Sequence, residues 1–560
     1  MPLEQPAWTG TGLLVRLAAL CWPLAANAQG LLEPAARLST EVNAATQAPG
    51  KPIAIGSRRE LFVDDYLVER LSGSAELRLH APVPREVVLI HDAPWEGNAT
   101  ANHCTVTEEG RIRLYYRAGN LSIENGQLQV GPESWCVAES RDGIDFERPH
   151  LNRIDFGGSR QNNIVFSRAQ AESWNCLVGA PAVFRDANPQ AAQGERYKSF
   201  LTTQDPLGLT LGTSADGLDW QVDRREPAIT QGAFDSQNVC FWDSVRGEYR
   251  GYWRSYTEGV TSAREWRPGG VRSVRTGTSS DLRQWRNLAD ISFVDSPTEE
   301  LYENGIAPYS RAPHLFLGFP LRYVDRAGAP STSDPNGGDR AGAERVARWP
   351  ASLQALPDRP SRVSRAAVSE RFGTALTDVL FMSSRDGVRF HRWREAFLRP
   401  GPERTGTWNY GQNLLAWNLV ETPASLPGGP PELSFYAAEG YWTSRATSLR
   451  RYTLRLDGFV SLHAGGQPGE LLTHPLTFTG TALKLNFATS AAGSVRVELQ
   501  TAAGEPWPGF TAQECDELFG DSVDRTVTWQ GASNLGRLAT QTVRLRIICL
   551  DADVYSLCFQ

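Results

Sequence analysis

Lysine is nearly absent from this 560-residue sequence: only Lys51, Lys198 and Lys484 occur, and arginine supplies the other 53 of the 56 basic residues. The 63 acidic residues outnumber the basic ones, which gives a formal net charge of −7. Nucleic-acid-binding proteins usually carry a basic face, so this balance argues against a nucleic-acid partner. The arginine bias is typical of a GC-rich genome, and a surface that binds sulfate or carboxylate groups is the alternative.

Long apolar runs are also missing. No run reaches the roughly 18 residues that a membrane-spanning helix needs, so we expect no membrane span. Apolar residues make up 41% and charged residues 21% of the chain, an ordinary globular composition that excludes a mainly disordered protein. The length predicts two to four domains, or fewer if one of them is a β-propeller.

Several catalytic and cofactor-binding motifs do not occur. The sequence has no G-x-x-x-x-G-K-[ST], no G-x-G-x-x-G opening a helix, no H-E-x-x-H and no G-x-S-x-G. Its eight cysteines are scattered without C-x-x-C spacing, which argues against a zinc site or a disulfide framework. We expect most of them to be buried small apolar residues, with one or two disulfide bridges as the alternative.

The N-terminal segment has the order of a secretory signal. Arg16 precedes the apolar residues 17–24, and Ala26-Asn27-Ala28 provides an A-x-A cleavage site. We predict a signal peptide over residues 1–28, a linker over 29–57 and a secreted or periplasmic protein.

A repeated pattern dominates the rest of the chain. It reads Ser, Asp, usually Gly, then an aromatic residue, and its copies start at Ser140, Ser214, Ser280 and Ser384. Asp-Gly between apolar stretches suits a tight turn, because Gly accepts a positive φ. A degenerate fifth copy follows at residues 456–459, and a pair of strand-like runs precedes each copy.

Five units of four short strands predict an all-β fold with a five-bladed β-propeller over residues 58–450. We expect a surface insertion with a short helix at about 325–369, and closure of the ring by the strand at 60–68. From residue 451 to 560 the strands alternate without the repeat, which predicts a C-terminal β-sandwich.

Several stretches resemble a known group of enzymes; they lie at residues 59–65, 94–97, 234–238, 311–314 and 449–455. The sequence resembles glycoside hydrolase family 32, its propeller resembles families 43 and 68, and its match is best with secreted family-32-like proteins of planctomycete-type bacteria. The resemblance implies a carbohydrate-active protein with a propeller followed by a sandwich. It implies no cofactor except a structural calcium, which some five-bladed propellers hold at their centre.

The catalytic acids of those families are not all present. The first blade opens with Ala101-Asn102-His103, and the second-blade aspartate falls near Ala182. Ser236 or Asp235 stands in place of the third-blade glutamate. Asp186 resembles the family-32 Arg-Asp-Pro aspartate, but its surroundings favour a turn residue.

The remaining acids at the heads of the blades are the candidates for catalysis, because a propeller gathers the starts of its inner strands around one funnel. Glycosidic cleavage needs two carboxyl groups across the scissile bond. We predict that Glu303 is the general acid and that Asp235 or Glu96 is the base, nucleophile or cation stabiliser. Candidate substrate-binding residues are Trp95, His103, Arg117, His314, Asp378, Trp408 and Glu439. A packing, turn-capping or ion-pairing role is the alternative for each of these residues.

Two functions follow. The first is a glycoside hydrolase that cleaves plant or algal poly- or oligosaccharides. The alternative is a non-catalytic glycan-binding or scaffold protein that kept the fold and lost the acids.

Overall fold

The fold is described from a computed structural model that covers residues 51–108, 110–328, 340–443 and 445–560. The predicted signal peptide and most of the predicted linker lie outside these residues. Within them, no helix combines the length and the apolarity that a membrane crossing requires.

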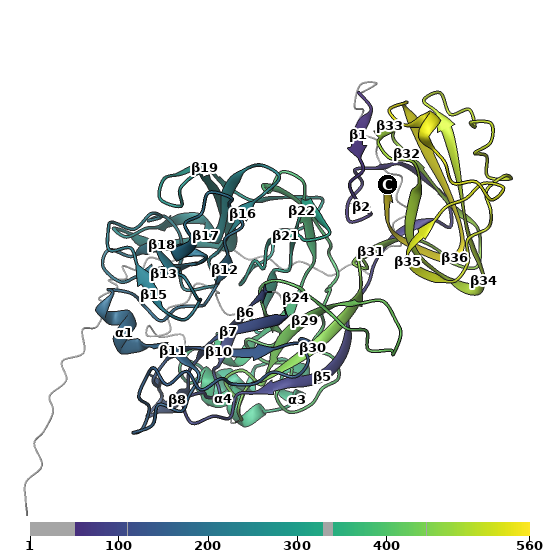
Figure 1. Cartoon of the computed structure of the whole chain (residues 1–560). Helices are drawn as coiled ribbons and strands as arrows, with labels where there is room; N and C mark the ends of the chain where they lie inside the picture. The colour runs from purple at the N-terminus through teal and green to yellow at the C-terminus, as the bar shows by residue number, and fades with distance from the viewer. Residues whose placement is uncertain (1–50, 109, 329–339, 444) are drawn as a thin grey trace, which may run out of the picture. The chain divides into compact units, whose positions relative to one another are not determined.

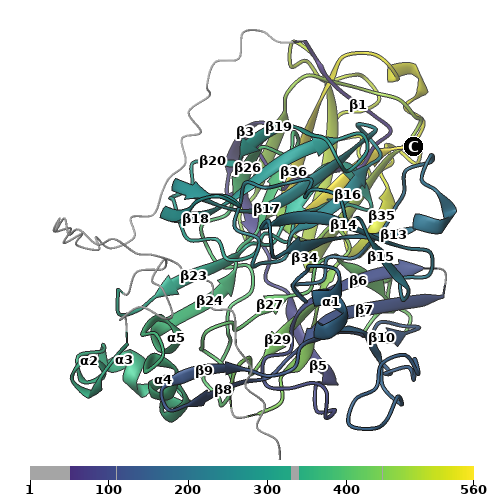
Figure 2. The same cartoon turned by 90° about the vertical axis from the view of Figure 1, so that its left-hand side faces the viewer.

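Five separate sheets form the blades of a β-propeller, as predicted (Figures 1 and 2). The first blade holds β6 (Ala101–Glu108), β7 (Arg111–Ala118), β10 (Ser134–Ser140) and β11 (Ile164–Ser167). The second holds β12 (Phe184–Arg185), β13 (Tyr197–Thr203), β14 (Gly208–Ser214) and β15 (Trp220–Val222). The third holds β16 (Val239–Asp243), β17 (Glu248–Thr261), β18 (Trp266–Ser279) and β19 (Trp285–Asp290).

The last two blades have an extra strand each. The fourth holds β20 (Ser292–Val294), β21 (Ala307–Tyr309), β22 (Ala312–Gly318), β25 (Met382–Ser384) and β26 (Arg389–Arg392). The fifth holds β27 (Leu414–Leu415), β28 (Val420–Thr422), β29 (Glu432–Glu439), β30 (Ser448–Arg455) and β5 (Val83–Ile90). Short elements between blades are β8 (Leu121–Glu124), β9 (Gln127–Val130), α1 (Arg168–Ser173) and the 3-10 turn Gln193–Glu195.

The ring is closed by β5, which pairs antiparallel with β30. The prediction that residues 60–68 close it is therefore wrong: β2 (Glu60–Leu61) pairs with β36 (Val543–Phe559) instead. The apolar side chains of residues 61–63 are buried, as a chain crossing between domains requires, whereas Val83 and Ile90 on β5 are about half exposed, as on an outermost strand.

The C-terminal domain is one network of ten paired strands with its own apolar core. Six strands come from the end of the chain: β31 (Val460–Ala464), β32 (Gly469–Thr473), β33 (Leu476–Phe478), β34 (Leu483–Thr501), β35 (Asp521–Thr526) and β36. Four come from its beginning: β1 (Ile53–Gly56), β2, β3 (Val68–Gly73) and β4 (Glu76–Leu79). A 3-10 turn, Gly536–Leu538, precedes β36. The described part of the chain thus begins in this domain, builds the propeller and returns to the domain. Boundaries at 58 and 450 therefore do not separate the two parts. The sandwich layering stays a prediction.

The repeats form the turn between the third and fourth strands of four blades. In the first, Asp142 Oδ1 accepts hydrogen bonds from the backbone N–H groups of Ile144 and Asp145 at 2.8 and 3.0 Å, and Gly143 has φ +75°. The third copy starts at Ser279 rather than Ser280, because Ser279 Oγ is the oxygen that accepts from the turn. The fifth copy is not a blade turn: residues 456–459 link β30 to β31.

A tyrosine on the second strand of one blade anchors the turn of the next. The hydroxyls of Tyr436, Tyr115 and Tyr252 donate to the carbonyls of Gly143, Gly217 and Gly387 at 2.6, 3.2 and 2.9 Å. The third turn has Leu282 in place of glycine, and the facing residue is Phe200, which lacks a hydroxyl and packs against Trp285 with ring centroids 5.6 Å apart. The repeat is therefore an inter-blade contact as well as a turn.

The insertion is a hairpin of β23 (Leu321–Asp325) and β24 (Ala375–Val379) that carries α2 (Ala343–Ala347), α3 (Ala351–Ala355), α4 (Arg359–Ala366) and α5 (Arg371–Thr374). Of the predicted segment 325–369, residues 329–339 lie outside the described residues. Phe372 packs edge-on against Tyr410 and Trp442, at 5.2 and 5.0 Å. The expected surface segment with one short helix is thus a four-helix cap that packs on the fifth blade.

The seven cysteines that the structure describes are all buried and unpaired. This confirms the expectation of small apolar residues, and it removes disulfide bridges among these seven.

Candidate active site at the head of the inner strands

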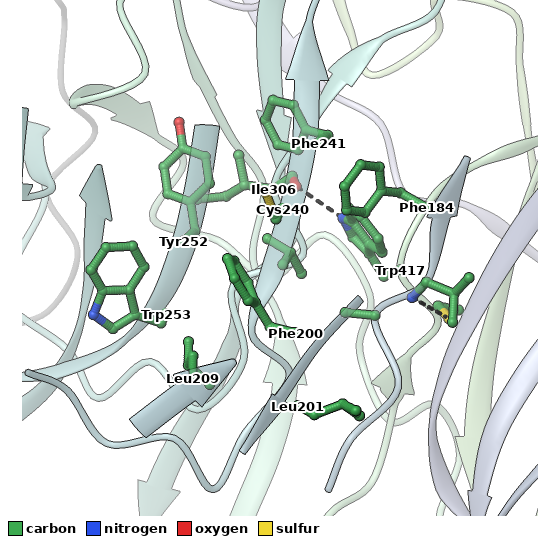
Figure 3. Close-up of a cluster of buried hydrophobic side chains, with 14 of the residues drawn as sticks. Phe184, Phe200, Leu201, Leu209, Cys240, Phe241, Tyr252, Trp253, Ile306 and Trp417 are labelled. Atoms are coloured by element: carbon green, nitrogen blue, oxygen red, sulfur yellow. Dashed lines mark hydrogen bonds between the residues drawn. The ribbon is translucent and has the colours of Figure 1, made fainter. Parts of the chain in front are cut away.

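An axial cavity of about 440 Å³ runs along the inner strands of the blades. Its wall is mostly apolar, with Phe184, Phe241 and Trp417 among the lining side chains (Figure 3). Two of the lining residues, Glu303 and Gln237, lie in the segments that lead into inner strands β21 and β16. The cavity therefore meets polar groups where the inner strands begin.

Glu303 is held by hydrogen bonds from two other blades. Asn102 Nδ2 donates to Glu303 Oε1 at 3.1 Å, and the backbone N–H of Gln237 donates to Oε2 at 3.0 Å. Asn102 has φ +54° and lies where the register of β6 against β7 shifts. Asparagine tolerates this left-handed backbone, and such bulges re-aim side chains.

Burial raises the pKa of Glu303 to about 7, even though the charge of Arg254 and the bond from Gln237 oppose the rise. A carboxyl group with this pKa is partly protonated at neutral pH and is therefore able to donate a proton.

Asp235 is the second carboxylate of the site. Arg254 Nη1 donates to Asp235 Oδ1 at 2.8 Å, and Arg254 Nη2 donates to the backbone carbonyl of Tyr302 at 2.6 Å. The Asp235 side chain is 67% exposed, whereas Arg254 is buried beneath it. The negative charge of Asp235 contributes to the raised pKa of Glu303, so the two carboxyl groups lie within electrostatic reach of each other.

Aromatic side chains adjoin these carboxyl groups. The Tyr302 and Tyr410 hydroxyls are hydrogen-bonded at 2.8 Å, and Arg254 lies 4.5 Å from the centroid of the Tyr302 ring. Tyr441 and Arg117 belong to the same neighbourhood, because Arg117 lowers the pKa of Glu303 and acts on the pKa of Tyr441. Of the ten predicted site residues, the structure thus brings together Asp235, Glu303 and Arg117.

Glu96 lies elsewhere, in a buried polar cluster. Its oxygens accept from Tyr116 Oη at 2.6 Å and from Arg148, and His91 Nδ1 lies 3.3 Å away. Burial alone would raise the pKa of Glu96, but His91, Arg148 and Tyr116 lower it to about 2. A carboxylate whose oxygens are all engaged fits a structural role rather than the catalytic one predicted.

Trp95 and His103 extend the same cluster. Trp95 Nε1 donates to Asn163 Oδ1 at 2.7 Å. His103 Nε2 lies 3.0 Å from His91 Nε2, and burial together with the charge of His91 holds the pKa of His103 well below its usual value. Both residues are engaged in packing and hydrogen bonds within the protein.

The other four predicted binding residues are also occupied. His314 Nε2 lies 3.3 Å from Glu60 Oε1, and Arg322 holds both oxygens of Asp378 at 2.9 and 2.6 Å. Trp408 Nε1 donates to the Gly401 carbonyl at 2.7 Å, and Glu439 accepts from Arg450 at 2.9 Å. These pairings support the structural alternative for each residue.

Sequence reasoning missed three members of the candidate site: Asn102, Gln237 and Arg254. A signal existed for Arg254, because a charged residue inside a strand of aromatic and small residues needs a buried partner. Asp186 was placed correctly: it caps its turn by accepting from the Asn188 N–H at 2.9 Å, and it accepts from Lys198 Nζ at 2.7 Å.

Among the described side chains, no three of His, Cys, Asp or Glu lie together in a way that would hold a metal ion. The structural calcium therefore stays a prediction.

No protein-family model matches the chain. A glutamate–tRNA ligase from Methanocaldococcus jannaschii is 26% identical over 171 residues, which cover 27% of this chain and 30% of the ligase. The chain thus spans less than a third of that curated relative.

Solved structures similar to the chain include several carbohydrate-active proteins. A glycosyl hydrolase from Bacteroides ovatus is 14% identical with a TM-score of 0.34, over 71% of this chain and 93% of that one. The family-32 β-fructofuranosidase of Bombyx mori is 10% identical with a TM-score of 0.34, over 86% and 94%. An N-acetylgalactosamine deacetylase from F. plautii is 12% identical with a TM-score of 0.37, over 68% and 95%. At these TM-scores and identities the similarities carry no residue assignment and no substrate.

Proposed function

We propose that the protein is a glycoside hydrolase whose site lies at Glu303 and Asp235. The observation that carries this proposal is the pKa of Glu303, which burial raises to about 7 next to the second, solvent-facing carboxylate Asp235. Two carboxyl groups in such different surroundings suit the two roles in glycosidic cleavage.

The proposed reaction uses Glu303 as the acid. Its carboxyl proton passes to the glycosidic oxygen as the bond from that oxygen to the anomeric carbon breaks. Asp235 then either takes a proton from the attacking water or attacks the anomeric carbon itself, and water later releases the sugar. Arg254 holds Asp235 in place in both versions, and Tyr302 and Tyr410 offer aromatic surface to a sugar ring.

The substrate class that we propose is a plant or algal poly- or oligosaccharide, handled outside the cytoplasm after export. A panel of such polysaccharides, with reducing-end release as the readout, tests it. E303Q and D235N should each lower kcat by about 10²–10⁴-fold, the range for loss of a general acid or base. Asp290→Asn is the matched control, because Asp290 is also an exposed carboxylate that pairs with an arginine, Arg275, at 2.9 Å.

Near-wild-type turnover in both variants would contradict the assignment. Retention of a glycan without any release would instead favour the non-catalytic glycan-binding function. That second function draws support from the first two blades, which have no carboxylate near Ala101 and Ala182, where an aspartate stands in the families that the sequence resembles.

A further inference from the structure

We propose that the substrate carries carboxylate or sulfate groups and that Arg371 and Arg117 bind them. This inference rests on the proposed function for the location of the site. It starts from the charges around Glu303, where arginines exceed the carboxylates available to pair with them.

The carboxylates near the site already have partners. Asp235 accepts from Arg254 at 2.8 Å, and Glu300 accepts from Arg272 at 3.3 Å. Among the described residues, both of these carboxylates are therefore engaged by Arg254 and Arg272.

Arg371 is the first arginine without an acidic partner. It opens α5 at the base of the insertion and is half-buried. In the described ranges no carboxylate lies within 4.0 Å of it, and its buried Nε has no hydrogen-bond partner. Its guanidinium lies 4.3 Å from the Phe372 ring, and Tyr302, Tyr323 and Tyr410 all act on its pKa. It therefore belongs to the aromatic neighbourhood of Glu303.

Arg117 is the second. Its nearest carboxylate oxygen, on Glu133, is 3.7 Å away, and the other oxygen of Glu133 already accepts from Arg168 at 2.8 Å. Arg117 is partly exposed on β7 of the first blade, and its charge reaches Glu303. Two guanidinium groups from separate parts of the chain thus act on residues of one site, Arg371 on Tyr302 and Tyr410 and Arg117 on Glu303.

A third arginine strengthens the positive potential from behind the aromatic residues. Arg365 on α4 is 2% exposed, and its Nε and Nη2 atoms have no partner in the described structure. Arg365 Nη1 donates to the backbone carbonyl of Trp442 at 2.8 Å, so its charge lies next to Tyr410 and Trp442. An uncompensated buried charge is costly, and a bound anion nearby would offset that cost.

Guanidinium groups bind carboxylates and sulfates through paired N–H donors, so both uronic acids and sulfated sugars fit this arrangement. Binding to the inactive E303Q variant separates recognition from turnover. The probes are oligogalacturonates against their methyl esters, and κ-carrageenan oligosaccharides against their desulfated forms, titrated by calorimetry.

At least one charged member should bind about tenfold or more tightly than its neutral counterpart, the effect of 1.4 kcal/mol. Arg371→Ala in the E303Q background should remove most of that preference, and added salt should weaken it. Arg348→Ala is the control, because Arg348, directly after α2 of the same insertion, is 77% exposed. The fold of each variant is checked by thermal unfolding.

Equal binding of charged and neutral partners, binding of neither charged probe, or an unchanged preference in R371A would overturn the inference. Cleavage of neutral glycans by the wild type would then leave the proposed hydrolase standing. Tight binding of a charged probe by the wild type without its cleavage would instead support the inference on anionic groups and contradict the proposed hydrolase.

Discussion

At the scale of single residues, the site depends on how Glu303 is solvated. Glu303 lines a mostly apolar cavity and accepts two hydrogen bonds from the described residues, which do not offset its burial, so its charged form is disfavoured. Arg254 and Arg117 act in the opposite direction and keep the pKa near 7. Glu96 shows the contrary balance, because three donors overcome its burial.

The first prediction concerns pH. If Glu303 must be protonated to donate, kcat falls as the pH rises through about 7. R117Q removes a positive charge that lowers the pKa of Glu303. The fall of kcat at alkaline pH, the alkaline limb of the pH profile, should therefore move to higher pH. Arg275→Gln, which breaks a surface pair on the third blade, should leave it in place. A limb that moves to lower pH in R117Q would contradict the assignment.

At the scale of elements, the blades are joined by the tyrosine–turn contacts. Each tyrosine hydroxyl donates to a glycine carbonyl in the repeat turn of the following blade. The turn of the third blade has Leu282 in place of glycine, and the facing residue is Phe200, which has no hydroxyl to donate. The repeat therefore encodes the blade and its contact with the neighbouring blade together.

Removing one such hydroxyl should cost stability. Tyr252→Phe leaves the Gly387 carbonyl without this donor, and we expect a loss of about 1 kcal/mol in the free energy of unfolding. Tyr256→Phe on the same strand is the control, since no hydrogen bond of its hydroxyl occurs among the described residues. Urea unfolding measures both, and equal effects would count against the contact.

The turn glycines give a second test at this scale. A Cβ on Gly143 would lie 2.7 Å from both Thr422 Cγ2 and Tyr436 Oη, besides the strain of φ +75°. Gly428 has φ +80° and nothing within 4 Å. Gly428→Ala should cost about 1–2 kcal/mol through its backbone alone, and Gly143→Ala should cost more. Similar melting temperatures for the two variants would show that Thr422 and Tyr436 move enough to accommodate a Cβ at position 143.

At the scale of the whole molecule, the first strands tie the propeller to the C-terminal domain. Glu60 on β2 is buried, and its carboxylate accepts from Arg385, which follows β25 in the fourth blade, at 2.9 Å, with His314 of β22 3.3 Å away. Burial would raise the pKa of Glu60, but His314 and Arg385 lower it to about 2.

This shift predicts a pH-dependent stability. Because the pKa of Glu60 is lower in the folded state than its value of 4.5 in the unfolded chain, ionised Glu60 stabilises the folded state fully at pH values above 4.5. This stabilisation is lost as the pH falls through about 2. Glu60→Gln should therefore cost about 3 kcal/mol at pH 7, and the difference from wild type should shrink below pH 4.5. Glu76→Gln, whose side chain is 56% exposed, is the control. Denaturant unfolding at several pH values measures this, and a pH-independent difference would argue against the ion pair.

The sequence by itself determined the five blades, because each repeat and its strands are local and the same turn chemistry recurs. It also predicted Glu303 and Asp235 as candidate acids, since both lie a few residues before an inner strand; their catalytic roles stay a prediction. Only the tertiary structure decided that the ring closes with β5 and that β1–β4 join strands more than 370 residues away, because pairing over such separations leaves no periodic mark in the sequence. It also decided which candidates are occupied: whether a glutamate such as Glu96 is free or fully paired depends on donors contributed by distant strands, and hence on packing rather than on its neighbours in the chain.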